Sequence, residues 1–230
     1  MKAPIPDNES ERLAALREYH ILDTSGEQAY DDLTALAAYL CETPIAMISL
    51  VDESRQWFKS RVGLNTQETP RDVAFCAHAI LQSEPLIVRD ALKDVRFADS
   101  ALVTRSPYIR FYAGYPLASP EGFTLGTLCA IDRKPRQLSP GQMKAMSSLA
   151  RQVMALLELR RVSARMADAL DKIKTLHGLL PICAWCKRIR DDKGYWSQVE
   201  AYVHDHTGAD FTHGICPDCF EKQRPKKVTG

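Results

Sequence analysis

Four cysteines near the C-terminus are the residues whose spacing most clearly predicts chemistry. They form two C-x-x-C pairs, Cys183-Ala-Trp-Cys186 and Cys216-Pro-Asp-Cys219, with 29 residues between the pairs. Each pair can span one edge of a tetrahedral ion, and four thiolates match zinc in softness and fill its coordination shell. The spacing therefore predicts a structural Zn(II) site with no open position for catalysis.

The size of this segment favours the same ion. The 40 residues from Pro181 to Phe220 bury too little apolar surface to fold without a staple, and ligated zinc can supply one. Redox pairs and another metal centre are the alternatives, although a redox C-x-x-C pair usually stands alone. No histidine follows either pair, as covalent haem attachment would require. His213 could replace a cysteine ligand or support one from outside the coordination shell.

The composition limits the class of protein. The chain has 230 residues, of which 45% are apolar and 26% are charged, and its formal net charge is +1. This balance argues against nucleic-acid binding as a main role, although a basic cluster in the cysteine-rich segment keeps it as an alternative. That cluster consists of Lys187, Arg188, Arg190 and Lys193.

The sequence also bears on the compartment. The N-terminus lacks the apolar stretch of a signal peptide, and no run of about 18 apolar residues occurs. We therefore expect a cytoplasmic protein without a membrane partner. In a reducing compartment, its cysteines would be ligands or core residues and not disulfides.

The elements that must position these residues follow from hydrophobic periodicity. Residues 8–20 fit a helix, and Ser25 with Gln28 fits a capping box that opens a second helix. The apolar face of that second helix would consist of Leu33, Leu36, Ala37 and Leu40. A short helix is expected over 74–81, and strands are expected over 44–52, 55–59, 86–88, 110–117 and 123–131. Without regular strand–helix alternation, this order predicts an α+β domain on an antiparallel sheet.

A long helix is expected from Gln142 to His177, opened by the capping box Ser139-Pro-Gly-Gln142. Its apolar residues fit a heptad seam, which predicts a parallel homodimer, whereas a helix folded back onto its own domain would give a monomer. One core position of the seam holds Leu149, Leu156, Ser163, Leu170 and His177, and the other holds Gln152, Leu159, Met166, Ile173 and Leu180.

Several segments together resemble a large subfamily of bacterial GAF domains. They are ILDT (21–24), PIAMISLVDESRQWFKS (44–60), ETPRDVAFCAHAIL (68–81), VRDALKDVRFADSALV (88–103), RFYAGYPL (110–117) and GTLCAIDRKPRQLS (126–139). The resemblance implies a six-stranded antiparallel sheet with helices on one side and a small-molecule cavity on the other. The tail, LLPICAWCKRIRDDKGYW…HGICPDC, resembles a segment found after sensor or receiver domains in bacterial signalling proteins.

The resemblance also suggests a sensor pocket around Cys76 and His78. These two residues follow a polar loop that we expect over residues 61–72. This pair could bind iron or haem or respond to oxidants, or it could be a small buried cysteine beside a histidine that caps backbone groups. The strand aromatics either line the pocket or fill the core. These are Trp57, Phe58, Phe111 and Tyr112.

These features predict a non-catalytic signalling protein of five segments. The segments are an N-terminal helix (1–20), a GAF sensor domain (21–141), a signalling helix (142–180), a zinc-stabilised module (181–222) and a flexible basic tail (223–230). Its ligand and its protein partner are not identifiable from the sequence. The alternative is a thiol enzyme that reduces free methionine sulfoxide, with Cys76 as nucleophile and Cys129 or Cys41 as the resolving thiol.

Overall fold

The computed structural model describes residues 2–177, 180–191 and 193–223. The chain forms two compact units, the first ending at Met166 and the second beginning at Ala167. The predicted boundaries at residues 20 and 141 do not separate compact units, because residues on both sides of each pack into one hydrophobic core. The predicted basic tail lies outside the described residues from 224 onward.

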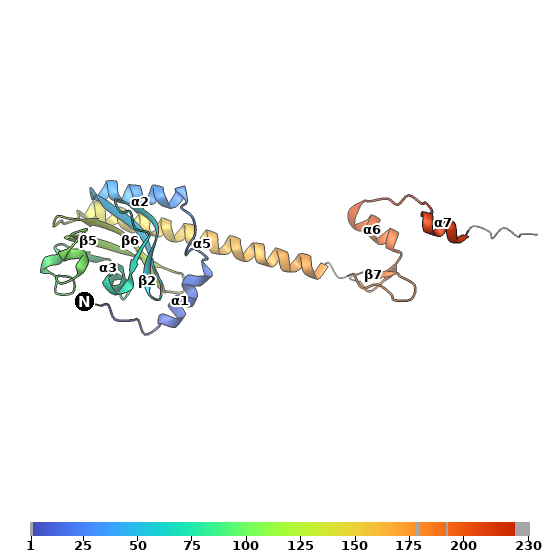
Figure 1. Cartoon of the computed structure of the whole chain (residues 1–230), viewed down its shortest axis with the longest axis horizontal. Coiled ribbons are helices and arrows are strands. Elements are labelled where there is room, and N and C mark those ends of the chain that lie inside the picture. The colour runs from blue at the N-terminus through green and yellow to red at the C-terminus, as the bar shows by residue number, and fades with distance from the viewer. Residues whose placement is uncertain (1, 178–179, 192, 224–230) are drawn as a thin grey trace, which may run out of the picture. The chain divides into compact units, whose positions relative to one another are not determined.

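A six-stranded antiparallel sheet forms the centre of the first unit and confirms the predicted α+β class (Figure 1). The strands lie in the order β3-β2-β1-β6-β5-β4. Their bounds are β1 Ile45–Val51, β2 Arg55–Val62, β3 Glu68–Pro70, β4 Leu86–Val88, β5 Phe111–Ala118 and β6 Thr124–Asp132. Every residue of β1 is buried, because this central strand is covered on both faces. The edge strand β3 has three residues, too few for hydrophobic periodicity in the sequence to reveal it.

One face of the sheet packs against helices α1 (Glu9–Glu18), α2 (Gln28–Cys41) and the first half of α5 (Pro140–His177). Figure 1 shows α2 and α5 running along the sheet. The other face is covered by the short helices α3 (Phe75–Ala79) and α4 (Ala101–Thr104) and by the 3-10 turns Arg71–Val73 and Ala91–Lys93. The unit therefore has two hydrophobic cores, one on each side of a single sheet.

The buried faces of α2 and α5 differ from the predicted ones. In α2 the buried residues are Tyr30, Thr34, Ala37 and Cys41, whereas Leu36 and Leu40 are 47% and 37% exposed. The buried face of α2 is shifted by about one residue from its most apolar face, because packing against the sheet sets the orientation of the helix. In α5 the stripe that meets the sheet is Met146, Ala150, Val153, Met154 and Leu157.

The predicted seam of α5 is therefore a different face from the one that packs in the first unit. Leu149 and Leu156 lie against the edge of the helix-side core, while Leu159, Met166 and Leu170 are exposed. The side chains of Ile173 and His177 lie outside the description. The parallel dimer remains a prediction, and only the exposed positions are free to contribute to it.

The start of α5 confirms the predicted capping box. The Gln142 backbone N–H donates to Ser139 Oγ at 3.2 Å, and the Ser139 N–H donates to Gln142 Oε1 at 2.9 Å. Two backbone donors at the helix N-terminus are satisfied in this way. Gln142 Nε2 also donates to the Leu40 carbonyl at 2.9 Å, which ties the start of α5 to the end of α2.

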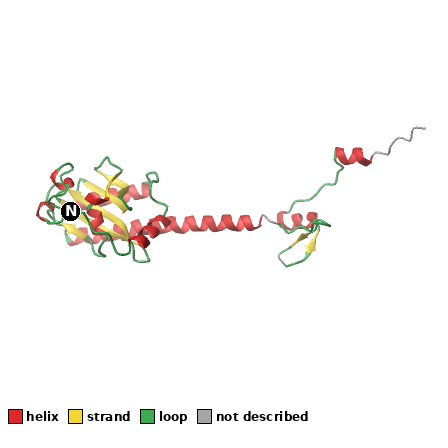
Figure 2. Ribbon diagram, turned by 60° about the horizontal axis from the view of Figure 1, so that its bottom comes forward, coloured by secondary structure: helices red, strands yellow, loops and turns green. Residues whose placement is uncertain are grey.

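The second unit contains a small hairpin and two helices. The hairpin pairs β7 (Ile189–Arg190) with β8 (Trp196–Ser197). Figure 2 draws it in yellow, apart from the larger sheet of the first unit. Helix α6 spans Val199–Thr207 and α7 spans Pro217–Gln223. Trp196 lies in β8 and is 47% exposed. Throughout the described residues, we find no helix both long and apolar enough to span a membrane.

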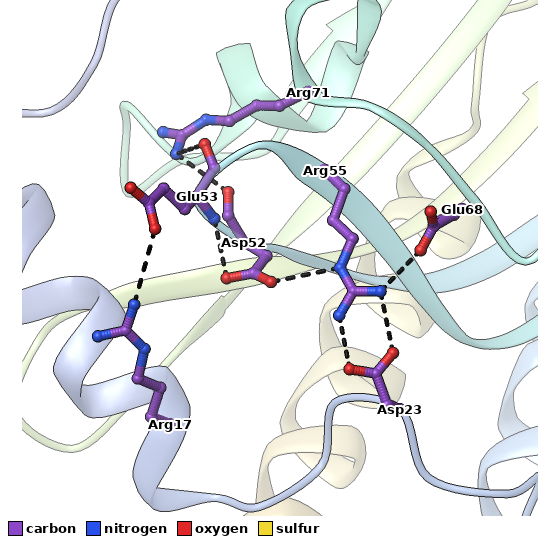
Figure 3. Close-up of polar contacts among 7 residues, drawn as sticks. All are labelled: Arg17, Asp23, Asp52, Glu53, Arg55, Glu68 and Arg71. Carbon is purple, nitrogen blue, oxygen red and sulfur yellow. Dashed lines mark hydrogen bonds and ion pairs between the residues drawn. The ribbon is translucent and has the colours of Figure 1, made fainter.

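A partly buried cluster of ions fixes α1 to the loops at the end of the sheet. Glu9 lies between two buried arginines, at 2.8 Å from Arg12 and 2.5 Å from Arg71. Arg71 also donates to the carbonyls of Asp52 and Glu53 in the β1–β2 turn, at 3.1 and 3.3 Å (Figure 3). Burial alone would raise the pKa of the Glu9 carboxyl, but its hydrogen bonds to Arg12 and Arg71 outweigh burial and lower it to about 2.

Replacing Glu9 by Gln should lower the free energy of unfolding by about 3 kcal/mol, because two buried guanidinium groups then lose their counter-ion. Since the pKa is depressed in the folded state, the loss should be complete at pH 7. It should shrink as the pH falls from 4.5 toward about 2, where the native carboxyl is protonated as well. Urea unfolding curves measure both effects.

Asp72→Asn is the matched control, because Asp72 forms an exposed ion pair with Lys2 at 3.0 Å. Removing such a pair should cost less than about 1 kcal/mol. Equal losses for the two variants, or a loss for Glu9→Gln that does not change with pH, would contradict the role of this cluster.

Candidate functional site

A cavity of about 200 Å³ lies under the face of the sheet that is opposite α2 and α5. Strands β1, β2, β3, β5 and β6 contribute to its walls, together with α3, α4 and the loops beside them. Its lining residues are Ile45, Met47, Gln56, Phe58, Leu64, Thr66, Thr69, Ala74, Phe75, Cys76, Leu102, Ser106, Pro107, Ile109, Tyr112 and Ile131. None of these side chains is acidic or basic, so the cavity is apolar with a few hydrogen-bonding groups.

Three of the six predicted pocket residues line this cavity, namely Phe58, Cys76 and Tyr112. Trp57 and Phe111 do not, since both are buried in the core on the helix side of the sheet. Successive residues of a strand point to opposite faces, so only one residue of each adjacent aromatic pair can reach the cavity. The sequence does not show which one.

His78 does not share a ligand position with Cys76. The Cys76 thiol faces the strands, whereas the His78 ring meets the edge of Phe97 at a centroid distance of 4.9 Å. Residues two apart on a helix project to different sides, and α3 keeps this separation. This geometry does not support the suggested joint binding of iron or haem by these two residues, which stays a prediction.

The Cys76 thiol is held by a buried hydrogen-bond network. Tyr112 Oη donates to its sulfur at 3.2 Å and Thr127 Oγ1 at 3.1 Å. Burial alone would raise the pKa of this thiol, but hydrogen bonds from the neighbouring Cys129 and from these hydroxyl groups outweigh burial and lower the pKa to about 7. Hydrogen bonds of this kind favour the thiolate over the thiol.

The other cysteines of the first unit have different surroundings. Cys129 contacts Cys76 on the cavity side of the sheet, and burial raises its pKa well above the usual value. Cys41 lies in the core on the helix side, where burial raises its pKa to about 11. Cys41 is therefore excluded as a partner of Cys76, and Cys129 is the thiol within reach.

Two polar atoms of the cavity wall lack hydrogen-bond partners. Gln56 is 5% exposed, and its Oε1 atom is buried without a donor. Thr69 Oγ1 is likewise buried without a partner. Gln56 and Thr69 lie opposite each other in the β2–β3 pair. Sequence reasoning missed both residues, because the pairing of β2 with β3 carries no local signal.

The first C-terminal cysteine pair forms a tight turn, and the second lies at the start of α7. Cys183 accepts the Lys187 N–H through its carbonyl at 3.0 Å, and its sulfur lies 3.5 Å from the Cys186 backbone nitrogen, which donates to it. Lys187 has φ +61°, which lets the chain turn back after the pair. Cys216 immediately precedes α7, and hydrogen bonds from the backbone of Cys219 lower the pKa of its thiol.

These donors suit zinc in type, but the two pairs are not assembled into one site. Across the parts of the chain that are described, no three side chains of His, Cys, Asp or Glu converge on a common point. His213, the predicted substitute ligand, is exposed. The four-cysteine zinc site therefore stays a prediction.

Comparison with known proteins gives the family. The family model described as GAF domain matches residues 25–157, which is more than half of the chain. The GAF domain of a phosphoenolpyruvate-protein phosphotransferase from Acinetobacter shares the fold with a TM-score of 0.50 and 16% identity, over 67% of this chain and 98% of that chain.

A cyclic di-GMP phosphodiesterase from Pseudomonas aeruginosa is 42% identical over 159 residues. The match covers 69% of this chain and 27% of that protein, so this chain spans about a quarter of the relative's length. The prediction of a non-catalytic protein is contradicted by this relative, which is named as an enzyme. The fold, the cavity and the family match together show that the chain belongs to the GAF domain family.

Proposed function

We propose that the chain is a sensory part of a signalling protein, in which the first unit binds a small molecule in the cavity beneath its sheet. The observation that carries this proposal is the cavity itself, an apolar space of about 200 Å³ with unpartnered polar atoms on its wall. Such a space is the usual form of a small-molecule site. The similarity to a cyclic di-GMP phosphodiesterase supports a setting in cyclic-dinucleotide signalling.

Strand β2 offers a physical route from the cavity to α5. Gln56 and Phe58 of β2 line the cavity, while Lys59, at a bulge in the same strand, is buried on the helix side. Lys59 Nζ lies 2.6 Å from Glu27 Oε1, and the same carboxylate oxygen lies 2.8 Å from Arg160 Nη1 on α5. A ligand that favours one position of β2 would thereby favour one position of α5.

A second set of contacts holds α5 where it leaves the sheet. Arg161 is only 7% exposed and lies 2.8 Å from both Glu121 and Glu158. Its guanidinium also lies 5.0 Å from the ring centroid of Tyr19, whose hydroxyl donates to Glu158. With Glu18 at 3.7 Å as a third acidic partner, this buried cation holds α5 in one preferred position. Ligand binding would then either stabilise or destabilise that position.

Ligand binding should depend on an open cavity. Fragments found by a thermal-shift screen against the full chain should raise Tm for the natural sequence but not for Leu102→Trp, whose indole would fill the cavity. Leu92→Trp is the control, because Leu92 is 47% exposed and does not line the cavity. True ligands should also slow the alkylation of Cys76, as measured by peptide mass spectrometry. A screen without any hit that meets both criteria would refute the sensory role.

Coupling to α5 should pass through Glu27. N-ethylmaleimide attached to Cys76 serves as a covalent occupant of the cavity, and Cys76→Ala treated in the same way corrects for the other cysteines. The occupant should change hydrogen exchange at residues 157–166, and Glu27→Gln should remove that change because it weakens the link between Lys59 and Arg160. Glu42→Gln, at an exposed position, should keep it. An unaltered response in Glu27→Gln would exclude this route.

For the second unit, we propose a structural zinc site formed by Cys183, Cys186, Cys216 and Cys219. The turn at Cys183–Cys186, the helix start at Cys216–Cys219 and the thiolate-stabilising backbone donors support it, and zinc would bring the two pairs together. The unit as described buries little, since every residue of α6 is at least partly exposed. Metal ligation would then supply the missing stability.

The purified chain should carry about one zinc per molecule by elemental analysis. Cys216→Ser should lose the metal and increase hydrogen exchange after residue 180, while residues 2–166 stay protected. His213→Ala should keep both the metal and the protection. Iron in place of zinc, or a metal-free second unit with full protection, would contradict the proposal.

A further inference from the structure

The wall of the cavity limits the chemistry of what it can hold. A charged ligand would lose its hydration on entry, and a counter-charge in the wall would be needed to replace it. None of the lining residues is Asp, Glu, Lys, Arg or His. Buried charged groups of the unit lie away from this lining, for example in the Glu9 cluster and along the Lys59–Glu27–Arg160 contacts. The cavity therefore selects against ions.

The size of the cavity sets a second limit. An apolar cavity of about 150 Å³ is enough for benzene, so a cavity of about 200 Å³ accommodates a molecule slightly larger, such as a fused pair of rings. A cyclic dinucleotide, with two nucleobases and two charged phosphates, exceeds this volume several times. The substrate of the phosphodiesterase relative is thus excluded as the occupant by both size and charge.

The unpartnered atoms of the wall give the ligand its polarity. Gln56 Nε2 lies 3.8 Å from the sulfur of Met47. A thioether sulfur can only accept a hydrogen bond, so the amide places its N–H₂ end toward Met47 and leaves Oε1 facing away. That carbonyl oxygen is buried without a donor. A buried acceptor without a hydrogen bond lowers the stability of the fold, and a ligand N–H or O–H group would supply the missing bond.

The opposite part of the wall needs no such partner. The Cys76 sulfur already receives hydrogen bonds from Tyr112 and Thr127, and Phe75 and Ile131, which also line the cavity, are apolar. A second buried polar atom without a partner, Thr69 Oγ1, lies across the strand pair from Gln56. Both buried, unpartnered atoms of the lining residues therefore lie on the β2–β3 side.

Resting on the sensory function proposed above, we infer that the ligand is an uncharged, largely apolar molecule of about ten non-hydrogen atoms that donates a hydrogen bond to Gln56. Its ring system faces Phe75 and Ile131, and its donor faces the β2–β3 side of the cavity.

Two isosteric probes test this inference on the full chain at pH 7. Indole carries an N–H donor, and benzofuran has the same shape without it. Indole should bind about fivefold more tightly by calorimetry, the effect of one buried neutral hydrogen bond. Indole-2-carboxylate and cyclic di-GMP should not compete with it. Gln56→Met, which removes the acceptor, should erase the difference between indole and benzofuran, while the exposed control Gln82→Met should keep it.

Binding of benzofuran to Gln56→Met shows that the variant is folded, and Thr69→Val provides a second, milder test of the same wall. An indole affinity no greater than that of benzofuran or of the carboxylate would overturn the ligand class. A charged compound that binds the natural chain but not Leu102→Trp would overturn the class while leaving the sensory function intact. A fragment screen without any cavity-dependent hit would remove both.

Discussion

The alternation of side chains across one central sheet is the constraint on which the rest of the first unit depends. Strands β1, β6 and β5 lie in the middle of the sheet, and their residues alternate between a core under α2 and α5 and a core around the cavity. Neither face is open to water, so almost every position in these strands must be apolar or hydrogen-bonded. The cavity exists because the helices on its side are short and leave part of that face uncovered by side chains.

Charge is distributed in agreement with this division. The buried ions lie at the ends of the sheet or on its helix side, each with a counter-ion within hydrogen-bond distance. Lys59 is the clearest case, because its side chain is fully buried and bound by Thr24, the Ser25 carbonyl and Glu27. At this bulge, Lys59 contacts Glu27 and Ser60 contacts Asp31 of α2. Gln56 and Phe58 of the same strand line the cavity. The uncharged cavity and the charged helix side are consequences of the same strand.

Local patterns predicted the elements well and their packing less well. The capping box at Ser139 and Gln142 and the strand over 44–52 depend on neighbours in sequence, and both are confirmed. The face of α2, by contrast, is set by the shape of the sheet, and apolar count alone favoured Leu36 and Leu40. The Glu9–Arg71 pair joins residues 62 positions apart, and no local sequence pattern near either residue predicts the contact. The pairing of Gln56 with Thr69 was hidden for the same reason, since long-range register has no local signature.

Gly114 shows how an absent side chain shapes the chemistry of the cavity. It follows Tyr112 by two residues on β5 and therefore points to the same face. A Cβ atom there would lie 2.1 Å from the Tyr112 hydroxyl oxygen, the group that donates to Cys76. The phenol ring folds back over the space that the glycine leaves, and this position brings its hydroxyl to the sulfur. The hydrogen bond from Tyr112 to the thiol thus depends on a residue that is absent from the cavity wall and has no functional group. In a GAF domain of this kind, the size of one residue in a neighbouring strand can set the hydrogen bonding of the cysteine, with every lining residue left as it is.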